Sequence, residues 1–184
     1  MNYFLAQVLN NQWANHRLLN TCAQLSEAEY VAQRTGFFPS IQATLCHILE
    51  VDRYYLTALE GDRDGQIKDF SEILPFAQLM QSQTQTDQRL VAFCESLREK
   101  DLARCVDLVR ADGVVCERID RLLLHLFEHQ IHHRGQVHTM LSATHVEPPQ
   151  LDEFFLDCDR PLRKDEEQRL QLDERRVWRD YVTG

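Results

Sequence analysis

The chain has 184 residues, of which 43% are hydrophobic and 27% are charged. This composition is typical of a globular protein and argues against a disordered, collagen-like or disulfide-packed chain, while the length suits one domain with a substantial core. The net charge of −9 disfavours nucleic acids and anionic membranes as partners, because phosphate binding requires clustered Lys and Arg side chains.

The cysteines and the N-terminus indicate the compartment. No CxxC pair occurs, which argues against a thioredoxin-type motif or a zinc ribbon. We expect reduced thiols at all six cysteines, which are Cys22, Cys46, Cys94, Cys105, Cys116 and Cys158. The first residues lack the basic region and the apolar run of a secretory signal, and no stretch has the apolar length of a membrane span. We therefore expect a cytoplasmic protein.

The helical spacing of apolar residues predicts two helices in the first third of the chain. The first covers about residues 2–25, where no Pro or Gly interrupts the pattern. The second lies within residues 38–61, with Pro39 near its first turn and Gly61 as its stop. Residues 62–72 are polar and are expected to form a loop.

Two more helices are predicted further along the chain, with extended structure between them. The third covers about residues 73–98 and has a weak start, because Pro75 fits only a first turn. Residues 104–118 alternate in polarity around turn-forming residues at 111–113, which predicts a short β-hairpin or a pair of extended strands. The fourth helix is expected over residues 119–143.

The C-terminal part is harder to interpret from its sequence. Residues 151–159 suit a short fifth helix. From residue 160 the chain is charged with few core-forming residues, as in a surface helix, a partner-binding extension or a partly disordered segment. Four helices of about 20 to 26 residues, with one long crossing connection, indicate an all-α four-helix bundle.

The densest chemistry lies on the fourth predicted helix. Five of the eight histidines occur there within fourteen residues, at His125, His129, His132, His133 and His138. All but the last share one arc of the helix, beside an apolar arc. Imidazoles four residues apart can chelate one metal ion. The spacing allows His129 to pair with His125, with His133 or, at three residues, with His132, so His129 belongs to every pair.

A catalytic metal commonly takes three ligands from the protein, so a third is needed from another helix. The other histidines are His16, His47 and His145. His47 lies on a helix that is apolar nearly all round, which predicts burial and therefore a need for a partner. His16 shares a face with leucines, and His145 follows the helix. A solvated histidine face is the alternative, and nearby Glu50 and Asp52 are expected at the surface.

The run LLLHLFEHQIHHRGQVHTML resembles the C-terminal signature of the DinB-like family. The run HILEVDRYYLTAL resembles the second helix of that family, and the Trp-Ala-Asn element at residues 13–15 resembles an element of its first helix. The resemblance covers about residues 1–145 and leaves residues 146–184 as an extension, packed on the bundle or trailing from it.

The resemblance implies an up-down-down-up four-helix bundle, frequent homodimers, and a three-ligand site for a divalent ion such as nickel or zinc. By the same resemblance the ligands are His47, His129 and His133, which leaves His125 and His132 around the site. Some relatives are thiol-dependent transferases or isomerases that use low-molecular-weight thiols.

Three hypotheses follow for the function. The first is a metal-dependent enzyme, similar to a thiol S-transferase or a hydrolase, that activates a thiol or a water for attack on an electrophilic small molecule. The second is a non-catalytic metal-binding protein of a stress response, and the third is a dimeric interaction protein. An open coordination position would favour the enzyme, because structural metal sites are normally closed by a fourth protein ligand.

Overall fold

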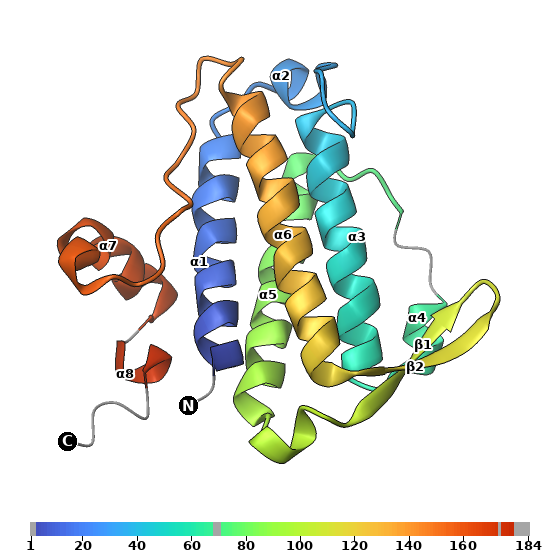
Figure 1. Ribbon diagram of the computed structural model, residues 1–184. Helices are drawn as coiled ribbons and strands as arrows, with labels where there is room; N and C mark the ends of the chain where they lie inside the picture. The colour runs from blue at the N-terminus through green and yellow to red at the C-terminus, as the bar shows by residue number, and fades with distance from the viewer. Residues whose placement is uncertain (1–2, 68–70, 173, 179–184) are drawn as a thin grey trace.

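Four long helices dominate the computed structural model, which describes residues 3–67, 71–172 and 174–178 (Figure 1). They are α1 (Tyr3–Cys22), α3 (Ile41–Leu59), α5 (Phe76–Ser96) and α6 (Ile119–Leu141). Helices α1 and α3 each pack against both α5 and α6. The colour gradient shows α1 and α6 running in one direction and α3 and α5 in the other (Figure 1). The predicted helical class is confirmed.

The starts of α3 and α5 follow from their flanking residues. The Ser40 hydroxyl accepts a hydrogen bond of 3.0 Å from the backbone N–H of Ala43, which caps α3. Pro39 precedes the cap and so lies near the first turn, as the sequence predicted. Pro75 stands at the N-cap of α5, outside the helix, because a proline inside it would remove a backbone donor.

Two short helices were not expected from the sequence. Helix α2 (Glu27–Val31) begins with a capping box between Ser26 and Glu29. Helix α4 (Arg63–Gln66) lies in the segment predicted as a polar loop, where the Asp62 side chain caps its first turn. Residues 68–70 of that predicted loop lie outside the described residues.

The predicted hairpin is present between α5 and α6. After a 3-10 turn, η1 (Glu99–Asp101), strand β1 (Cys105–Arg110) pairs antiparallel with β2 (Gly113–Arg118). The turn ends at Gly113, whose φ of +136° lies in the region that favours glycine. The hairpin is anchored where Leu108 is buried and where the Tyr54 hydroxyl donates a hydrogen bond of 2.7 Å to the Val109 carbonyl.

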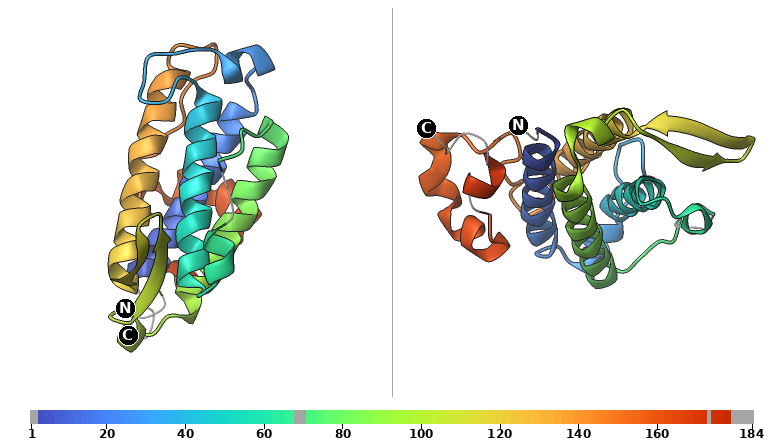
Figure 2. Two further views of the ribbon diagram at one scale, coloured as in Figure 1. Left: turned by 90° about the vertical axis from the view of Figure 1, so that its right-hand side faces the viewer. Right: turned by 90° about the horizontal axis from the view of Figure 1, so that it is seen from below.

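The C-terminal segment differs from its prediction. In place of a fifth helix over residues 151–159 there is only a 3-10 turn, η2 (Asp157–Asp159), because Phe155 has a φ of +45° and interrupts the helical path. Helices α7 (Arg160–Leu170) and α8 (Glu174–Val177) follow, on the outer side of α1 and away from the hairpin (Figures 1 and 2). The division at residue 145 stays a prediction.

The C-terminal segment is held to α1 by aromatic and ionic contacts. The ring of Phe155 stacks on Trp13 with centroids 5.2 Å apart. Glu166 of α7 accepts a hydrogen bond of 2.8 Å from the Trp13 indole and pairs with Arg17 at 2.6 Å. Within the described residues, no helix is both long enough and apolar enough to cross a membrane.

The apolar core of the bundle is divided into two clusters by a layer of polar side chains. One cluster contains Trp13, Leu56, Leu90 and Leu126, and the other contains Leu18, Ile41, Leu79 and Val137. Between them, all four long helices contribute buried polar residues, called here the polar layer: Asn11, Asn15, Asp52, Gln83, Asp87, Gln130 and Arg134.

Candidate metal centre

The structure brings three histidines from two helices together. His47 lies on α3, and His129 and His133 lie one turn apart on α6, which packs beside α3. One ligand atom from each ring falls in a set whose members all lie within 4.8 Å of one another. The Nε2 atoms of His47 and His129 are 3.1 Å apart. These three histidines therefore form a compact group of donors, called here the histidine triad.

The spacing of the histidine triad suits one metal ion. Two nitrogens that each bind a tetrahedral ion at about 2.0–2.1 Å lie about 3.3 Å apart. The separation of 3.1 Å between His47 and His129 is close to this value. His133 completes the set, with its ring centroid 4.4 Å from that of His129 and 4.8 Å from that of His47.

The electrostatics keep the rings of His129 and His133 neutral. Burial, together with the neighbouring imidazoles of His133 and His47, lowers the pKa of His129 to about 3. Burial also lowers the pKa of His133, against its hydrogen bond to Gln136, which raises it. Neutral imidazoles have a free lone pair, which is the form that binds a metal ion.

Neighbouring polar groups orient two of the rings. The Oε1 atom of Gln136 can only accept, so His133 donates its Nδ1–H to it at 2.8 Å and keeps the lone pair on Nε2. Glu50 lies 3.6 Å from Nδ1 of His47, on the side of the ring away from His129 Nε2, which His47 faces with its Nε2 atom. Such contacts fix the tautomer and the direction of metal-binding histidines. The Nδ1 atom of His129 is buried and has no hydrogen-bond partner among the described residues.

Two features of the triad differ from the sequence analysis. His47 was predicted to be buried, but 27% of its side chain is exposed, because the triad opens at the edge of the bundle. Phe38 was not identified as a site residue. Its ring centroid lies 4.4 Å from that of His47 and 5.6 Å from that of His133, so it forms an apolar wall. A loop residue without periodicity carries no sequence signal for such a contact.

The other five histidines lie outside the triad. His125 and His132 are exposed on α6, where His125 contacts the ring of Tyr55 and His132 lies 3.1 Å from the side chain of Gln136. The remaining three each have another partner: His16 contacts Asn20, His138 contacts the Pro149 carbonyl, and His145 contacts Glu29. The alternative pairing of His129 with His125 has the larger ring separation, at 6.3 Å.

Comparison with known proteins agrees with the fold. The model of the DinB family matches residues 1–169. The chain belongs to the DinB family. It is 23% identical to Protein DinB of Bacillus subtilis over 145 residues, which cover 71% of this chain and 80% of that protein. It is 26% identical to Uncharacterized protein YizA of the same organism over 127 residues, which cover 69% of this chain and 79% of the relative.

Two solved structures have a similar fold. A DinB-like protein of Bacillus subtilis, YjoA, superposes with a TM-score of 0.60 at 22% identity, covering 79% of this chain and 96% of the relative. A DinB-like protein of Bacillus cereus superposes with a TM-score of 0.57 at 15% identity, covering 75% and 90%. The family match extends 24 residues beyond the predicted end of the bundle at residue 145, through most of α7 (169 − 145 = 24).

In this DinB-family chain the polar layer lies beside the triad, since Gln130 directly follows His129. Asp52 was expected at the surface, but it is 1% exposed. It accepts hydrogen bonds from Gln83, at 2.8 Å, and from Gln130. Gln83 also bonds Asp87 at 3.0 Å. The sequence does contain a sign of this layer. Positions 83 and 87 are polar, although they lie on the core-facing side of α5 between Leu79 and Leu90.

Burial controls the ionisation of the polar layer. It raises the pKa of Asp52 to about 8, with a further contribution from the charge of Asp87. It also raises the pKa of Asp87 to about 7, against hydrogen bonds from Gln83 and Asn15. Arg134 hydrogen-bonds Asn15 at 2.9 Å and Gln130 at 3.0 Å, and it supplies a positive charge near both carboxyl groups. The layer therefore binds protons that exposed carboxylates would release.

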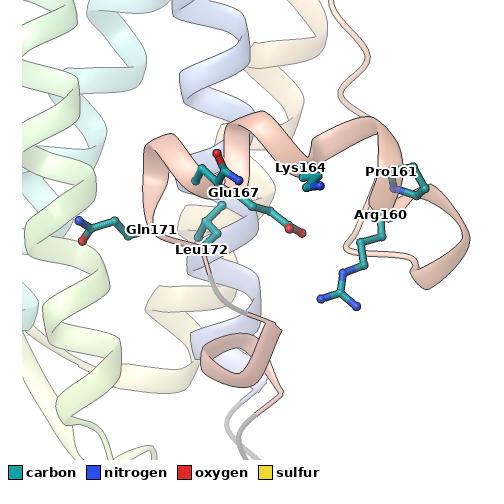
Figure 3. A pocket seen from close by; sticks show the side chains of 7 residues that line it. Arg160, Pro161, Lys164, Glu167, Gln171 and Leu172 are labelled. Carbon is teal, nitrogen blue, oxygen red and sulfur yellow. The ribbon is translucent and has the colours of Figure 1, made fainter.

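A separate hollow lies at the C-terminal segment of this DinB-family protein. It has a volume of about 800 Å³ and is lined by residues of α7 and the adjoining turn. Figure 3 shows Arg160, Lys164 and Glu167 along α7, with Gln171 and Leu172 at its end. No residue of the histidine triad lines it, so it is distinct from the candidate metal centre.

Proposed function

We propose that this DinB-family protein binds one divalent metal ion, nickel or zinc, through His47, His129 and His133, and that it is a metal-dependent enzyme. The observation that carries the proposal is the 3.1 Å separation of the Nε2 atoms of His47 and His129, which matches two ligands of one ion. The neutral state of His129 and His133 supports the same assignment.

The number of donors favours catalysis over a structural role. In the described part of the chain, the group around His129 contains three histidines and includes no carboxylate or thiol ligand. Structural zinc sites are normally closed by a fourth protein ligand, whereas catalytic sites keep a position for water or substrate. A bound ion there would lower the pKa of a thiol or a water, which makes it a nucleophile at neutral pH.

The surrounding residues have defined tasks in this proposal. Phe38 covers one side of the triad and limits the access of bulk water. Glu50 and Gln136 hold the rings of His47 and His133 in the ligand orientation. The partly exposed ring of His47 marks the side from which substrate enters. We propose a low-molecular-weight thiol or water as the nucleophile and an electrophilic small molecule as its target.

The proposal includes the topology and the assembly. The course of the four long helices supports an up-down-down-up bundle. Two exposed apolar side chains, Leu124 at 61% and Ile131 at 55%, lie seven residues apart on α6 and favour a homodimer through this face. Sedimentation of wild type and of Ile131→Glu tests the dimer: the variant should sediment as a monomer, and an unchanged coefficient would exclude this face.

Elemental analysis of protein purified without a His tag tests the metal site. Wild type should contain about one divalent ion per chain, and His129→Ala should lose it. His125→Ala is the matched control, because His125 lies four residues before His129 on the same helix face but outside the triad. Full loss of metal from His125→Ala, or wild type that stays empty when titrated with nickel and zinc, would overturn the assignment.

A thiol-conjugation and ester-hydrolysis screen separates the enzyme from a non-catalytic metal-binding protein. Metal-loaded wild type should convert at least one electrophile faster than the uncatalysed reaction, and His47→Ala should reduce the rate. Equal rates for the two proteins would support the alternative function, a metal-binding protein of a stress response without turnover.

A further inference from the structure

Two cysteines lie side by side on the exposed hairpin. In the strand register, Cys105 is opposite Arg118 and Cys116 is opposite Asp107, so the two cysteines are diagonal neighbours on one face of the ribbon. Both side chains are exposed, and the two thiols interact with one another. The fold therefore juxtaposes two accessible thiols that are eleven positions apart in the sequence.

We infer that Cys105 and Cys116 are a dithiol modification site, which low-molecular-weight disulfides oxidise to a disulfide bond across the hairpin. The inference rests on the strand register, on the contact between the thiols and on their exposure. It does not depend on the histidine triad, because no cysteine belongs to that group.

The charges around the pair assign different roles to the two thiols. Arg118 stands directly opposite Cys105, and its guanidinium interacts with the Cys105 charge. A cation beside a cysteine favours the thiolate, which is the nucleophile in disulfide exchange. The pKa of Cys116 is raised, first by its hydrogen bond with Cys105 and then by burial and by the charges of Cys105 and Glu117. The register places Arg118 opposite Cys105 and Asp107 opposite Cys116, so we assign Cys105 as the attacking thiol and Cys116 as the resolving one.

The other cysteines lack these features. Burial raises the pKa of Cys22 and of Cys94 to about 12, and it also raises the pKa of Cys46. These three thiols are shielded from an oxidant in solution. Cys158 is exposed, but it lies in η2 and not on the hairpin. It provides an internal control for simple accessibility.

The reaction balances in two exchange steps. The Cys105 thiolate attacks one sulfur of the disulfide reagent, which forms a mixed disulfide and releases one thiolate that takes up a proton. The Cys116 thiol then loses its proton and attacks the Cys105 sulfur, which forms the Cys105–Cys116 bond and releases the second thiol. The protein loses two electrons and two protons, and the reagent is reduced to two thiols.

The hairpin can accommodate the bond. A disulfide requires its β-carbons to lie about 3.5–4.5 Å apart, which is closer than a diagonal pair in a flat ribbon. Two-stranded ribbons twist strongly. In the described part of the chain no third strand pairs with β1 or β2. We therefore expect the ribbon to twist further as the bond forms, which brings the two sulfurs into bonding distance.

Peptide mapping after treatment with glutathione disulfide tests the inference on the full chain as isolated. Trypsin cleaves after Arg104, Arg110 and Arg118, which places Cys105 and Cys116 on separate peptides, 105–110 and 111–118. These peptides should stay joined in non-reduced digests and separate on reduction, and the intact mass should fall by two hydrogen atoms. Cys158→Ser should give the same joined peptides in the same yield.

Single variants test the order of the two steps. Cys116→Ser should stop at the mixed disulfide and carry one glutathione on Cys105. Cys105→Ser should acquire glutathione on Cys116 several-fold more slowly. Three results with wild type would overturn the inference. They are glutathione on the hairpin without joined peptides, a bond from either peptide to Cys158, and no reaction. Loss of metal from the His129→Ala protein should leave the joined peptides unchanged, so failure of either proposal is seen separately.

Discussion

Asp52 on α3 accepts a hydrogen bond from Gln130, the residue that directly follows His129 on α6. The carboxyl is fully buried in the centre of the bundle, and its second oxygen has no hydrogen-bond partner among the described residues. A buried group with so few partners depends strongly on each of them. The ring of His129 is thus linked through one residue to an interior contact between the two helices that carry the triad.

Gln130→Ala should weaken both the fold and the metal site. Removal of a partner from a buried polar group costs about 1–3 kcal/mol of unfolding free energy, and loss of an outer contact reduces metal affinity by about tenfold. Urea denaturation and metal titration measure the two effects. Glu128→Ala, at an exposed position on the same helix, should change neither. Equal behaviour of the two variants would show that the Asp52 contact is unimportant.

The buried carboxyl groups should make the protein less stable at alkaline pH. The folded protein holds the protons of Asp52 and Asp87 up to about 8 and about 7, whereas the unfolded chain releases them near 3.8. Because the folded state binds more protons, the free energy of unfolding falls as pH rises through this window. Above pH 6.5 the histidines of the unfolded chain no longer titrate. In that range Asp52→Asn and Asp87→Asn should each reduce the slope of the unfolding free energy against pH.

The histidine triad should have the opposite effect on the acid side. With its pKa lowered to about 3, His129 stays neutral in the folded protein while the unfolded chain takes up a proton below 6.5. The contribution of His129 to the free energy of unfolding of metal-free protein should therefore fall as pH decreases from 6.5. The difference between wild type and His129→Gln, followed by urea denaturation from pH 7 to 4, isolates this contribution; parallel curves would exclude it.

Phe38→Ala should make a bound ion exchange faster with little change in stability. Phe38 is partly exposed and covers His47 and His133, so its removal admits water to the triad at a small cost in buried area. We expect the rate of metal release to a chelator to rise about tenfold. Phe37→Ala is the control, because Phe37 is 80% exposed. A release rate equal to that of wild type would show that Phe38 does not shield the metal site.

Glu166→Ala should loosen the C-terminal segment from α1. The variant loses the bonds of Glu166 to the Trp13 indole and to the Arg17 guanidinium. It leaves Arg17 with its longer contacts to Glu153, at 3.3 Å, and to the Gln150 carbonyl, at 3.2 Å. We expect a loss of about 2 kcal/mol in unfolding free energy, at the lower end for hydrogen bonds to charged groups. Limited proteolysis between residues 143 and 160 should be faster than in Asp165→Ala, whose side chain is exposed. Equal cleavage would show that Glu166 does not hold α7.

The long elements could be predicted because each has its own local signal. Apolar periodicity placed the four long helices to within about three residues at each end, and the turn at residues 111–113 placed the hairpin. Chelating spacing identified His129 with a second histidine of α6, but three pairings remained. The preference for His133 and the addition of His47 required the resemblance to a family, because contact between helices is a tertiary property.

The remaining differences have physical causes. Asp52 was assigned to the surface because single charged residues are seldom buried, and only the polar residues of three other helices make its burial tolerable. Phe38 and the C-terminal contacts of Glu166 join residues far apart in sequence. No local sequence pattern indicates such contacts. The short helix α4 was missed for another reason, because its start depends on a single capping side chain.

The polar layer also determines how far the helices can slide along one another. Apolar side chains are interchangeable partners, so two purely apolar helices tolerate a shift by one turn of about 5.4 Å. Such a shift would move Asp52 and Arg134 into the apolar clusters above and below and leave both polar side chains without partners. Polar residues at core positions are known to fix helix register in this way. The layer thus fixes the register of α3 against α6. It keeps His47 opposite His129 whether or not an ion is bound.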